Sequence, residues 1–430
     1  MKFEYRKKFF DGFENKTVRF IDLFAGMGGL RIGFEQALED IGLVGESVFV
    51  SEVKTHAIKT YYRNFPNEEI YGDITKINAE TIPDFDVLLA GFPCQAFSSA
   101  GKRRGFEDTR GTLFFDVARI LKEKKPTGFL LENVEGLVRH DGGKTFFIIL
   151  NTLEELGYTV SYKILDGKDF GLAQTRKRIY ITGTKDKEVD LDNFALQTSK
   201  LKQVIDVDVP AENNKFTEKL LKHYNLSELA GKKIRDKRGG INNIHSWDFE
   251  LKGNVSGEQK KLLELLLKQI RNRKWASVIG IDWMDGMPLT IDMIRTFYDN
   301  EKLQSMLDDL VDKGYLVYEF PKKKVGNNRV YDTTLPKGYN IVTGKLSFKY
   351  SQVLDPEGIS PTLVATDISK LAIPVLDGIR QLTMREGLRL FGYPKSYELN
   401  DLSESQAYDL LGNTVCVPVI RAISKRLMLV

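Results

Sequence analysis

Cys94 is the residue with the clearest chemical potential, and it is one of only two cysteines in the chain. The apolar run at 87–90 is typical of a buried strand, and Gly91 and Pro93 end that strand. Cys94 is therefore expected at the carboxyl end of a strand, where ligands and reactive groups gather in open α/β sheets. A helix N-terminus or a nearby cation lowers the pKa of such a thiol, and the thiolate is a good nucleophile. The alternative is a buried structural cysteine, which is the commoner state of a free thiol.

An acid and two arginines later in the chain could assist this thiol. Glu132 directly follows the apolar residues 128–131, on a strand expected beside that of Cys94, although the carboxylate could instead cap a helix. Gln174, Arg176 and Arg178 alternate in an extended segment and so share one face. Two guanidiniums there could hold a carbonyl oxygen, a phosphate or a carboxylate. A thiol, an acid and arginines in one crevice indicate covalent attack on a ring polarised by proton donation.

A glycine-rich loop at 22–30 lies between the first expected strand and the first expected helix. Its glycines allow the backbone to approach a ligand closely, although a tight structural turn would also explain them. The dinucleotide-binding fingerprint is incomplete, because Gly29 directly follows Gly28. Glu52 ends the next strand, where an acid suits a ribose diol, and Asp73 could accept a hydrogen bond from an adenine amino group. The pattern favours a nucleoside-bearing cofactor.

The elements that must position these side chains alternate between strand and helix from about 18 to 185. Such alternation predicts a parallel, doubly wound sheet. The expected strands are 18–24, 47–50, 86–90, 128–131, 158–165 and 178–182, and the expected helices are 30–38 and 57–64. Further helices are expected at 258–273, at 380–391 and from 415 onward.

Composition describes an ordinary globular protein of two domains, with 42% hydrophobic and 28% charged residues among 430. Cys94 and Cys416 provide no disulfide framework and are not spaced as metal ligands, so no metal is expected. The first residues lack an apolar run of signal-peptide length, which predicts a cytoplasmic location without a membrane segment.

Net charge is only +4, so a nucleic acid would have to meet local basic clusters such as 232–240 and 321–324. Solvated surface is the alternative for those clusters.

Five motifs in this order identify a family. They are Phe24–Gly28, Gly91–Gln95, Glu132–Val134, Gln174–Arg178 and Gly412–Val415. The chain resembles the cytosine-C5 DNA methyltransferases of bacterial restriction–modification systems. The resemblance implies an α/β fold: a Rossmann-like, doubly wound sheet that binds S-adenosylmethionine, with a smaller, variable target-recognition domain. We expect the catalytic domain at 1–185 and 375–430, and the target-recognition domain at 186–374.

The resemblance also implies a mechanism. Cys94 would attack C6 of a cytosine, while Glu132 contacts N3 and the exocyclic amine. Arg178, together with Arg176, would hold O2 and orient Glu132. C5 would then take the methyl group of S-adenosylmethionine before Cys94 is released. Because C5 is hidden in the base stack, the cytosine must be flipped out of the duplex.

Cofactor contacts are carried over onto matching positions of the same motifs. Glu52 would take the ribose hydroxyls and Asp73 the adenine amine. Many relatives have an aromatic residue after the ribose acid, whereas this chain has Val53, so adenine stacking would fall to Phe24 and Ile74. The remaining expected cofactor residues are Ala25, Gly26, Gly28, Leu30, Pro93, Asn413 and Val415.

The segment after Cys94 resembles the family's mobile catalytic loop, whose cations can meet DNA phosphates when the loop closes. The expected DNA contacts are Gln95, Ser98, Lys102, Arg103 and Arg104. In the variable region, Lys345, Lys349 and Tyr350 are also candidates. The helix at 260–270 is expected to be a core element of an insertion around 215–330 and not a DNA-reading helix.

Double-stranded DNA is the expected partner, with a cognate restriction endonuclease and a monomeric enzyme. One alternative is a methyltransferase of transfer RNA, but that branch has a short variable region, whereas this one is long and basic. The other alternative is a DNA-binding protein without catalysis, which intact Cys94, Glu132, Arg176 and Arg178 oppose.

Overall fold

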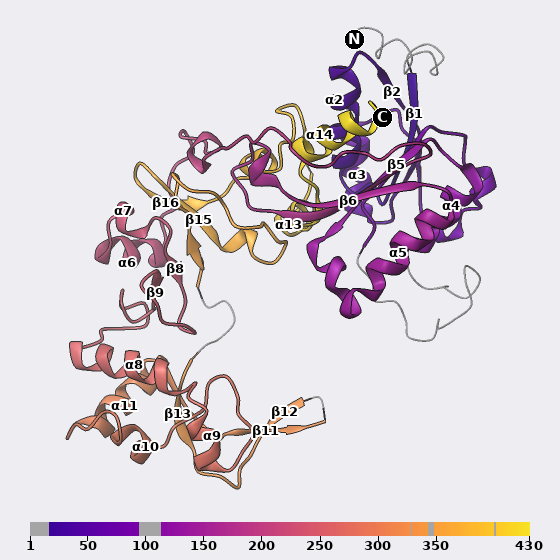
Figure 1. Cartoon of the computed structure of the whole chain (residues 1–430). Coiled ribbons are helices and arrows are strands. Elements are labelled where there is room, and N and C mark those ends of the chain that lie inside the picture. The colour runs from indigo at the N-terminus through magenta and orange to yellow at the C-terminus, as the bar shows by residue number, and fades with distance from the viewer. Residues whose placement is uncertain (1–16, 94–112, 327, 343–347, 400) are drawn as a thin grey trace. The chain divides into compact units, whose positions relative to one another are not determined.

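The computed structural model describes residues 17–93, 113–326, 328–342, 348–399 and 401–430 (Figure 1). The chain divides into two compact units. Unit 1 comprises Met1–Asp206, Glu357–Ile368 and Thr383–Val430, and unit 2 comprises Val207–Pro356 and Ser369–Leu382. The expected boundaries at 185/186 and 374/375 therefore differ from these. Residues 186–206 and 357–368 belong to unit 1, whereas 375–382 belong to unit 2.

Unit 1 is built on a seven-stranded sheet with the order β3-β2-β1-β4-β5-β7-β6. The strands are β1 (Thr17–Leu23), β2 (Val44–Ser51), β3 (Ile70–Tyr71), β4 (Val87–Ala90), β5 (Gly128–Val134), β6 (Thr159–Asp166) and β7 (Lys177–Thr184). The neighbours from β3 to β5 pair in parallel, but β7 is antiparallel to both β5 and β6. The fully parallel sheet that we expected is therefore wrong at β7. The β6–β7 connection contains no long crossover helix, and a short connection reverses the chain direction.

Helices cover both faces of this sheet, as a doubly wound fold requires. They are α2 (Gly29–Asp40), α3 (Thr55–Asn64), α4 (Leu113–Lys124), α5 (Lys144–Glu155), α12 (Met384–Leu390), α13 (Glu404–Asn413) and α14 (Val417–Leu427). The side chains of successive residues of β1 point to opposite faces of the sheet. Phe20 packs against Phe34 of α2 with ring centroids 5.2 Å apart, and α2 lies so close to α14 that a Cβ at Gly33 would be 2.6 Å from Ile420.

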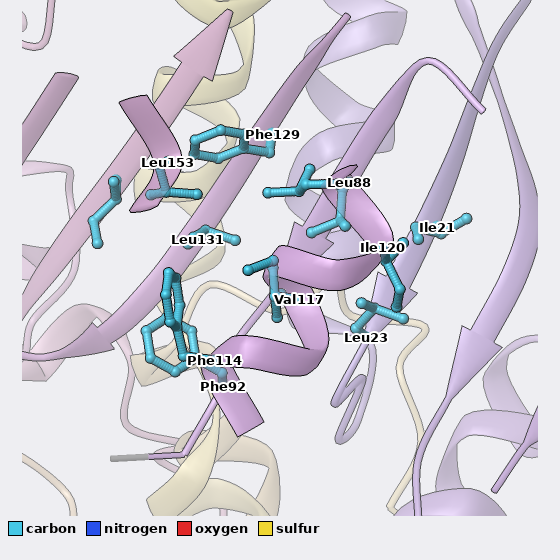
Figure 2. Close-up of a cluster of buried hydrophobic side chains, with 14 of the residues drawn as sticks. Ile21, Leu23, Leu88, Phe92, Phe114, Val117, Ile120, Phe129, Leu131 and Leu153 are labelled. Atoms are coloured by element: carbon cyan, nitrogen blue, oxygen red, sulfur yellow. The ribbon is translucent and has the colours of Figure 1, made fainter. Parts of the chain in front are cut away.

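The main hydrophobic core lies on the other face of the sheet. Figure 2 shows Val117 and Ile120 of α4 packed over Ile21, Leu88 and Leu131 of the strands. All five side chains are fully buried. Burial of such aliphatic side chains stabilises the fold by roughly 1.5–3 kcal/mol each. This core fixes the carboxyl ends of β1, β4 and β5, from which the candidate site is built.

Unit 2 contains a five-stranded sheet with the order β16-β15-β14-β8-β9 and a mostly helical insertion. The sheet strands are β8 (Lys233–Ile234), β9 (Asn243–Ile244), β14 (Gln352–Val353), β15 (Leu371–Val375) and β16 (Gly378–Gln381), accompanied by α6 (Lys215–His223) and α7 (Leu226–Leu229). The insertion comprises α8 (Gly257–Gln269), α9 (Lys274–Ile279), α10 (Ile291–Arg295), α11 (Leu303–Asp312), β10 (Leu316–Glu319), β11 (Lys322–Val325), β12 (Asn328–Tyr331) and β13 (Gly338–Ile341).

Two local expectations in this region need correction. The helix expected at 380–391 begins only at Met384, because Arg380 pairs with Ile373 in the sheet and Thr383 caps α12 through the backbone N–H of Glu386. Tyr350 does not face DNA: it is fully buried in the core of unit 2. The expectation that α8 is a core element is confirmed, since it buries Gln259 and four leucines at helical spacing.

None of the helices in the described residues is long and apolar enough to span a bilayer.

Candidate active site

A cavity of about 410 Å³ opens in unit 1 at the carboxyl ends of β1, β2, β4 and β5. Its volume lies in the range of small-molecule sites. The expected site residues that line it are Phe24, Ala25, Gly26, Leu30, Glu52, Asp73, Ile74, Pro93, Glu132, Arg176, Arg178, Asn413 and Val415. Residues separated by hundreds of positions in the chain thus meet around one space.

The turn from β1 into α2 forms one wall of the cavity. Phe24, Gly26 and Gly28 have positive φ angles of 54°, 54° and 76°, and Gly28 is the N-cap of α2. Gly28 is expected to contact the cofactor but is not among the lining residues; a Cβ there would lie 2.6 Å from the ring of Phe65. The nearest heavy atom to a Cβ on Gly26 would be the Phe24 carbonyl oxygen at 4.0 Å, so this glycine leaves room in the cavity.

Glu52 is held rigidly against this turn. Its Oε2 accepts a hydrogen bond from the Gly26 N–H at 2.7 Å, and its Oε1 accepts from the N–H groups of Val53 and Lys54, both at 2.8 Å. A carboxylate has about four acceptor sites, so about one remains for a ligand hydroxyl. Glu52 therefore both shapes the loop and presents an acceptor to the cavity.

One carboxylate oxygen of Asp73, Oδ1, is bound by the neighbouring Thr75. Oδ1 accepts from the N–H and hydroxyl of Thr75, and these bonds lower the pKa of the carboxyl group. Oδ2 lies 3.4 Å from the Lys76 ammonium. Val53 leaves 63% of its surface exposed, whereas Ile74 is buried, so the apolar wall comes from Ile74 and the half-buried Phe24.

Glu132 and Arg178 form an ion pair in the deepest part of the site. Arg178 Nε lies 3.1 Å from Glu132 Oε1, and only 8% of the Glu132 surface is exposed. Burial raises the pKa of Glu132, and the charges of Arg178 and Arg176 oppose this rise. A raised pKa makes a carboxyl group easier to protonate, and the protonated form can donate. Register places Glu132 beyond Leu131, which lies opposite Ala90 of β4, as expected for neighbouring strands.

Arg176 is engaged differently from Arg178. Its guanidinium donates to the main-chain carbonyl oxygens of Leu363, Gly412 and Thr414 at 2.7–3.0 Å. The backbone N–H of Arg176 donates to Asp166 Oδ1. Arg176 is 1% exposed, and burial lowers its pKa to about 10. The expectation that both arginines act on the same substrate atom is not supported by this geometry, because the two terminal nitrogens of Arg176 already bind protein carbonyls.

Two further residues of the motifs, to which the sequence analysis assigned no role of their own, position the site. Gln174 donates to the Leu390 carbonyl and accepts from the Leu363 N–H, so it ties the same returning segment as Arg176. Asn133 donates to the Phe92 carbonyl at 2.8 Å and so fixes the chain just before Cys94. The sequence signal for these two residues was their place in the arginine and acid motifs. Their hydrogen-bond partners lie far away in the sequence, so the motifs did not indicate them.

Cys94 itself lies outside the described residues, as do Gln95, Ser98, Lys102, Arg103 and Arg104. Pro93, the last described residue before them, lines the cavity. The other cysteine, Cys416, is fully buried, and burial raises the pKa of its thiol to about 12. Such a thiol is inert, which leaves Cys94 as the candidate nucleophile.

The sequence family follows from comparison with known proteins. The model of the C-5 cytosine-specific DNA methylase family matches residues 18–428. The chain belongs to this family. It is 58% identical over 420 residues to the type II methyltransferase M.NlaIV of Neisseria lactamica, with 96% of this chain and 99% of that protein covered. It is 56% identical, with the same coverage, to M.NgoBV of Neisseria gonorrhoeae.

Solved structures agree on the fold. The Dnmt2 methyltransferase of S. pombe superposes with a TM-score of 0.51 at 14% identity, covering 96% of this chain and 98% of that one. The protein is thus a DNA cytosine-5 methyltransferase with the α/β fold of its family.

Members of this methyltransferase family use S-adenosylmethionine, and the residues present fit that group. Gly26 leaves open space beside an acid that has an acceptor site free, and Phe24 and Ile74 supply apolar walls. Glu52 would hold the ribose and Asp73 the adenine. With this cofactor bound, the residues at β1 and β2 would form a nucleoside half of the site, and those at β4, β5 and β7 a chemical half.

Proposed function

We propose that this methyltransferase modifies C5 of a cytosine flipped out of a short specific sequence in double-stranded DNA, through a covalent bond between Cys94 Sγ and C6. The observation that carries the proposal is the buried Glu132–Arg178 pair beside the end of β4, four residues before Cys94. This pair is what activation of a cytosine ring requires: an acid that can donate, held by a cation that can also bind a carbonyl oxygen.

The chemical steps balance in atoms and charge. The Cys94 thiolate bonds to C6 while Glu132 donates a proton to N3, which turns C5 into a nucleophile. S-adenosylmethionine, when bound, would supply an electrophilic methyl group, and its sulfonium sulfur would leave as a neutral thioether. After C5 has been methylated, a base removes the C5 proton, the C6–Sγ bond breaks, and N3 returns its proton to Glu132. Arg178 holds O2 through Nη2 in this scheme, because its Nη1 donates to the Lys177 carbonyl at 2.8 Å, whereas Arg176 acts through the protein backbone.

Cofactor binding is assigned to the nucleoside half of the site. Glu52 accepts from the ribose and Asp73 from the adenine amine through Oδ2, while Phe24 and Ile74 contact the ring. Asn413 and Val415 close the cavity from the segment that Arg176 holds. Ala25, Leu30 and Pro93 complete its lining.

DNA binding is assigned to the segment after Cys94 and to unit 2. Gln95, Ser98, Lys102, Arg103 and Arg104 are proposed to contact the DNA around the flipped base, the three cations on its phosphates. Unit 2 is proposed to read the sequence, and a cognate restriction endonuclease to cut the same site when it is unmethylated. The type II names of the relatives support this pairing.

Incubation with labelled S-adenosylmethionine and duplex DNA, followed by bisulfite sequencing, tests the proposal. Methylation of C5 at one short motif is expected. Trapping on a duplex with 5-fluorocytosine at that position tests the covalent step, because the C5 substituent cannot leave and the protein stays attached to DNA. Label in transfer RNA only would support the RNA alternative. No label in either, with DNA still bound, would support a silent DNA-binding protein.

A further inference from the structure

The insertion of unit 2 has the element order of a winged helix. Helix α8, with the short additional helix α9 after it, is followed by a bridge strand at Leu289, which pairs with Tyr339 of β13. Then come α10, α11 and the strands β10 to β13. The insertion has a hydrophobic core of its own, with Leu266, Leu307 and Leu310 fully buried. In a winged helix, the last helix or the hairpin that follows it contacts DNA.

The hairpin of this module is long, basic and exposed. Strands β10 and β13 pair first, and β11 and β12 continue beyond them, away from α8, α10 and α11 (Figure 1). Between Pro321 and Tyr331 the chain carries four cations and no acid. Lys324 and Arg329 are exposed, as are Val325, Val330 and Tyr331, which leave 43–55% of their surface open.

The register of the hairpin gathers the cations on one face. Lys322 lies opposite Tyr331, and Lys324 lies opposite Arg329. Directly opposed residues of an antiparallel pair share a face, so three cations and an aromatic ring stand together. Like charges directly opposed destabilise a hairpin, and a two-stranded hairpin is only marginally stable without other packing. A polyanion laid on this face would remove that repulsion.

Unlike Lys323 and Lys237, the two tip cations Lys324 and Arg329 have no acidic partner among the described residues. Lys323 lies 3.3 Å from Asp332, and Lys237 lies 3.2 Å from Asp285. Among the described residues, no carboxylate lies within ion-pair distance of Lys324 or Arg329. Their charges are therefore available to a ligand.

Helix α11 is a poor candidate for the same task. Its exposed positions include Gln304, Asp308 and Asp312, and it carries no cation between Leu303 and Asp312. The Asp308 carboxylate also accepts from Gln304 and from the hydroxyl of Tyr339. An acidic face repels phosphate, so the helix that would normally enter the groove is electrostatically unsuited to it.

We propose that the β11–β12 hairpin is a wing that binds the phosphate backbone of the duplex, with Lys324 and Arg329 as its main contacts. The wing adds affinity that is independent of base sequence, and α11 stays off the DNA. This inference rests on the proposed function only in requiring that duplex DNA is the substrate.

Equilibrium binding of the full chain to a short duplex tests the wing, over a series of salt concentrations. The duplex carries the motif found by bisulfite sequencing. The variant Lys324→Ala/Arg329→Ala should bind about tenfold more weakly at physiological salt, and its slope of log K against log salt should be shallower by about two. Lys324→Arg should bind like the wild type. Lys261→Ala/Lys268→Ala, on the exposed face of α8, removes the same charge and should change both values little.

The outcomes separate this inference from the proposed function. Failure of the wild type to bind or methylate any duplex would count against the proposed function itself. Wild-type binding with an unchanged salt slope in the hairpin variant would overturn the wing. So would an equal loss in the α8 variant, because overall charge would then explain the effect. Circular dichroism confirms that each variant is folded, and bisulfite sequencing of the hairpin variant should return the same motif.

Discussion

At the scale of residues, two arginines of one motif have different partners. Arg178 pairs with the candidate acid Glu132, whereas Arg176 binds three main-chain carbonyl oxygens from segments far along the chain. The motif alone treats them as a pair. A guanidinium that binds main-chain carbonyls holds a wall of the cavity in place. A guanidinium that pairs with a carboxylate lowers the pKa of that carboxyl group.

Replacement of the candidate acid Glu132 should nearly stop methyl transfer while the affinities for DNA and cofactor stay almost unchanged. We expect Glu132→Gln to lower kcat about a hundredfold or more, because the amide cannot supply the proton to N3. The Kd for DNA and the KM for S-adenosylmethionine should stay within about twofold. The matched control is Glu135→Gln, an exposed residue on the same segment. Steady-state transfer of labelled methyl groups measures the effect, and substantial turnover by Glu132→Gln would contradict the assigned role.

The two arginines should be separable by conservative substitution. Arg176→Lys loses bonds to buried carbonyl oxygens, each worth about 1–3 kcal/mol when left unpaired, so Tm should fall clearly. Arg178→Lys should keep a Tm close to that of the wild type but lower kcat, because a lysine cannot bridge Glu132 and a substrate oxygen in the same geometry. Thermal melts and turnover together distinguish the two. Equal losses of Tm would show that both arginines are structural.

At the scale of elements, the site depends on how β1 turns into α2 and how β7 joins the sheet. The turn needs positive φ at Phe24, Gly26 and Gly28, which brings the start of α2 to the cavity. Strand β7 runs against its neighbours, and this reversal lets Arg178 enter the same space as Glu132 of β5, with Val134 opposite Arg178 in the ladder. The position of the ion pair is thus a property of sheet register.

The buried carboxyl group of Asp22 in β1 should make the free energy of unfolding fall as pH rises. Burial raises the pKa of Asp22 to about 8, while the nearby Arg31 opposes this rise and Glu52 and Glu35 add to it. The unfolded state therefore loses this proton at lower pH than the folded state. The stabilisation is complete below pH 3.8 and is lost progressively up to about pH 8.

The variant Asp22→Asn should remove this contribution to the pH dependence. Its free energy of unfolding should decline less between about pH 5 and 8 than that of the wild type. Urea titrations at several pH values measure the two slopes. Parallel pH profiles would show that the Asp22 carboxyl does not hold its proton in the folded state.

At the scale of the whole molecule, the chain consists of two compact units with their own hydrophobic cores. Every residue that lines the candidate cavity belongs to unit 1, although the lining comes from both ends of the chain. Unit 2 is inserted between these ends. A cofactor in the cavity therefore contacts only unit 1.

Cofactor binding should consequently stabilise the units unequally. Saturation with S-adenosylmethionine at a hundred times Kd should stabilise unit 1 by about 2.7 kcal/mol and leave unit 2 little changed. Hydrogen exchange read by mass spectrometry should show added protection in the peptides of β1, β2 and β5, and little in those of α8 and α11. Equal protection throughout would mean that the two units unfold as one.

The sequence by itself determined the family, most strands of the sheet of unit 1 with helices α2 and α3, and thirteen of the residues around the cavity. Those conclusions rest on local signals: apolar runs, glycines at a turn and short motifs, which are set by neighbouring residues. The tertiary structure decided the direction of β7, the boundaries of the units, the task of Arg176 and the exposed face of the β11–β12 hairpin. Each depends on partners far away in the chain: Arg176, for example, binds carbonyls 187 to 238 positions distant. A local pattern does not encode which distant backbone group will satisfy a buried charge.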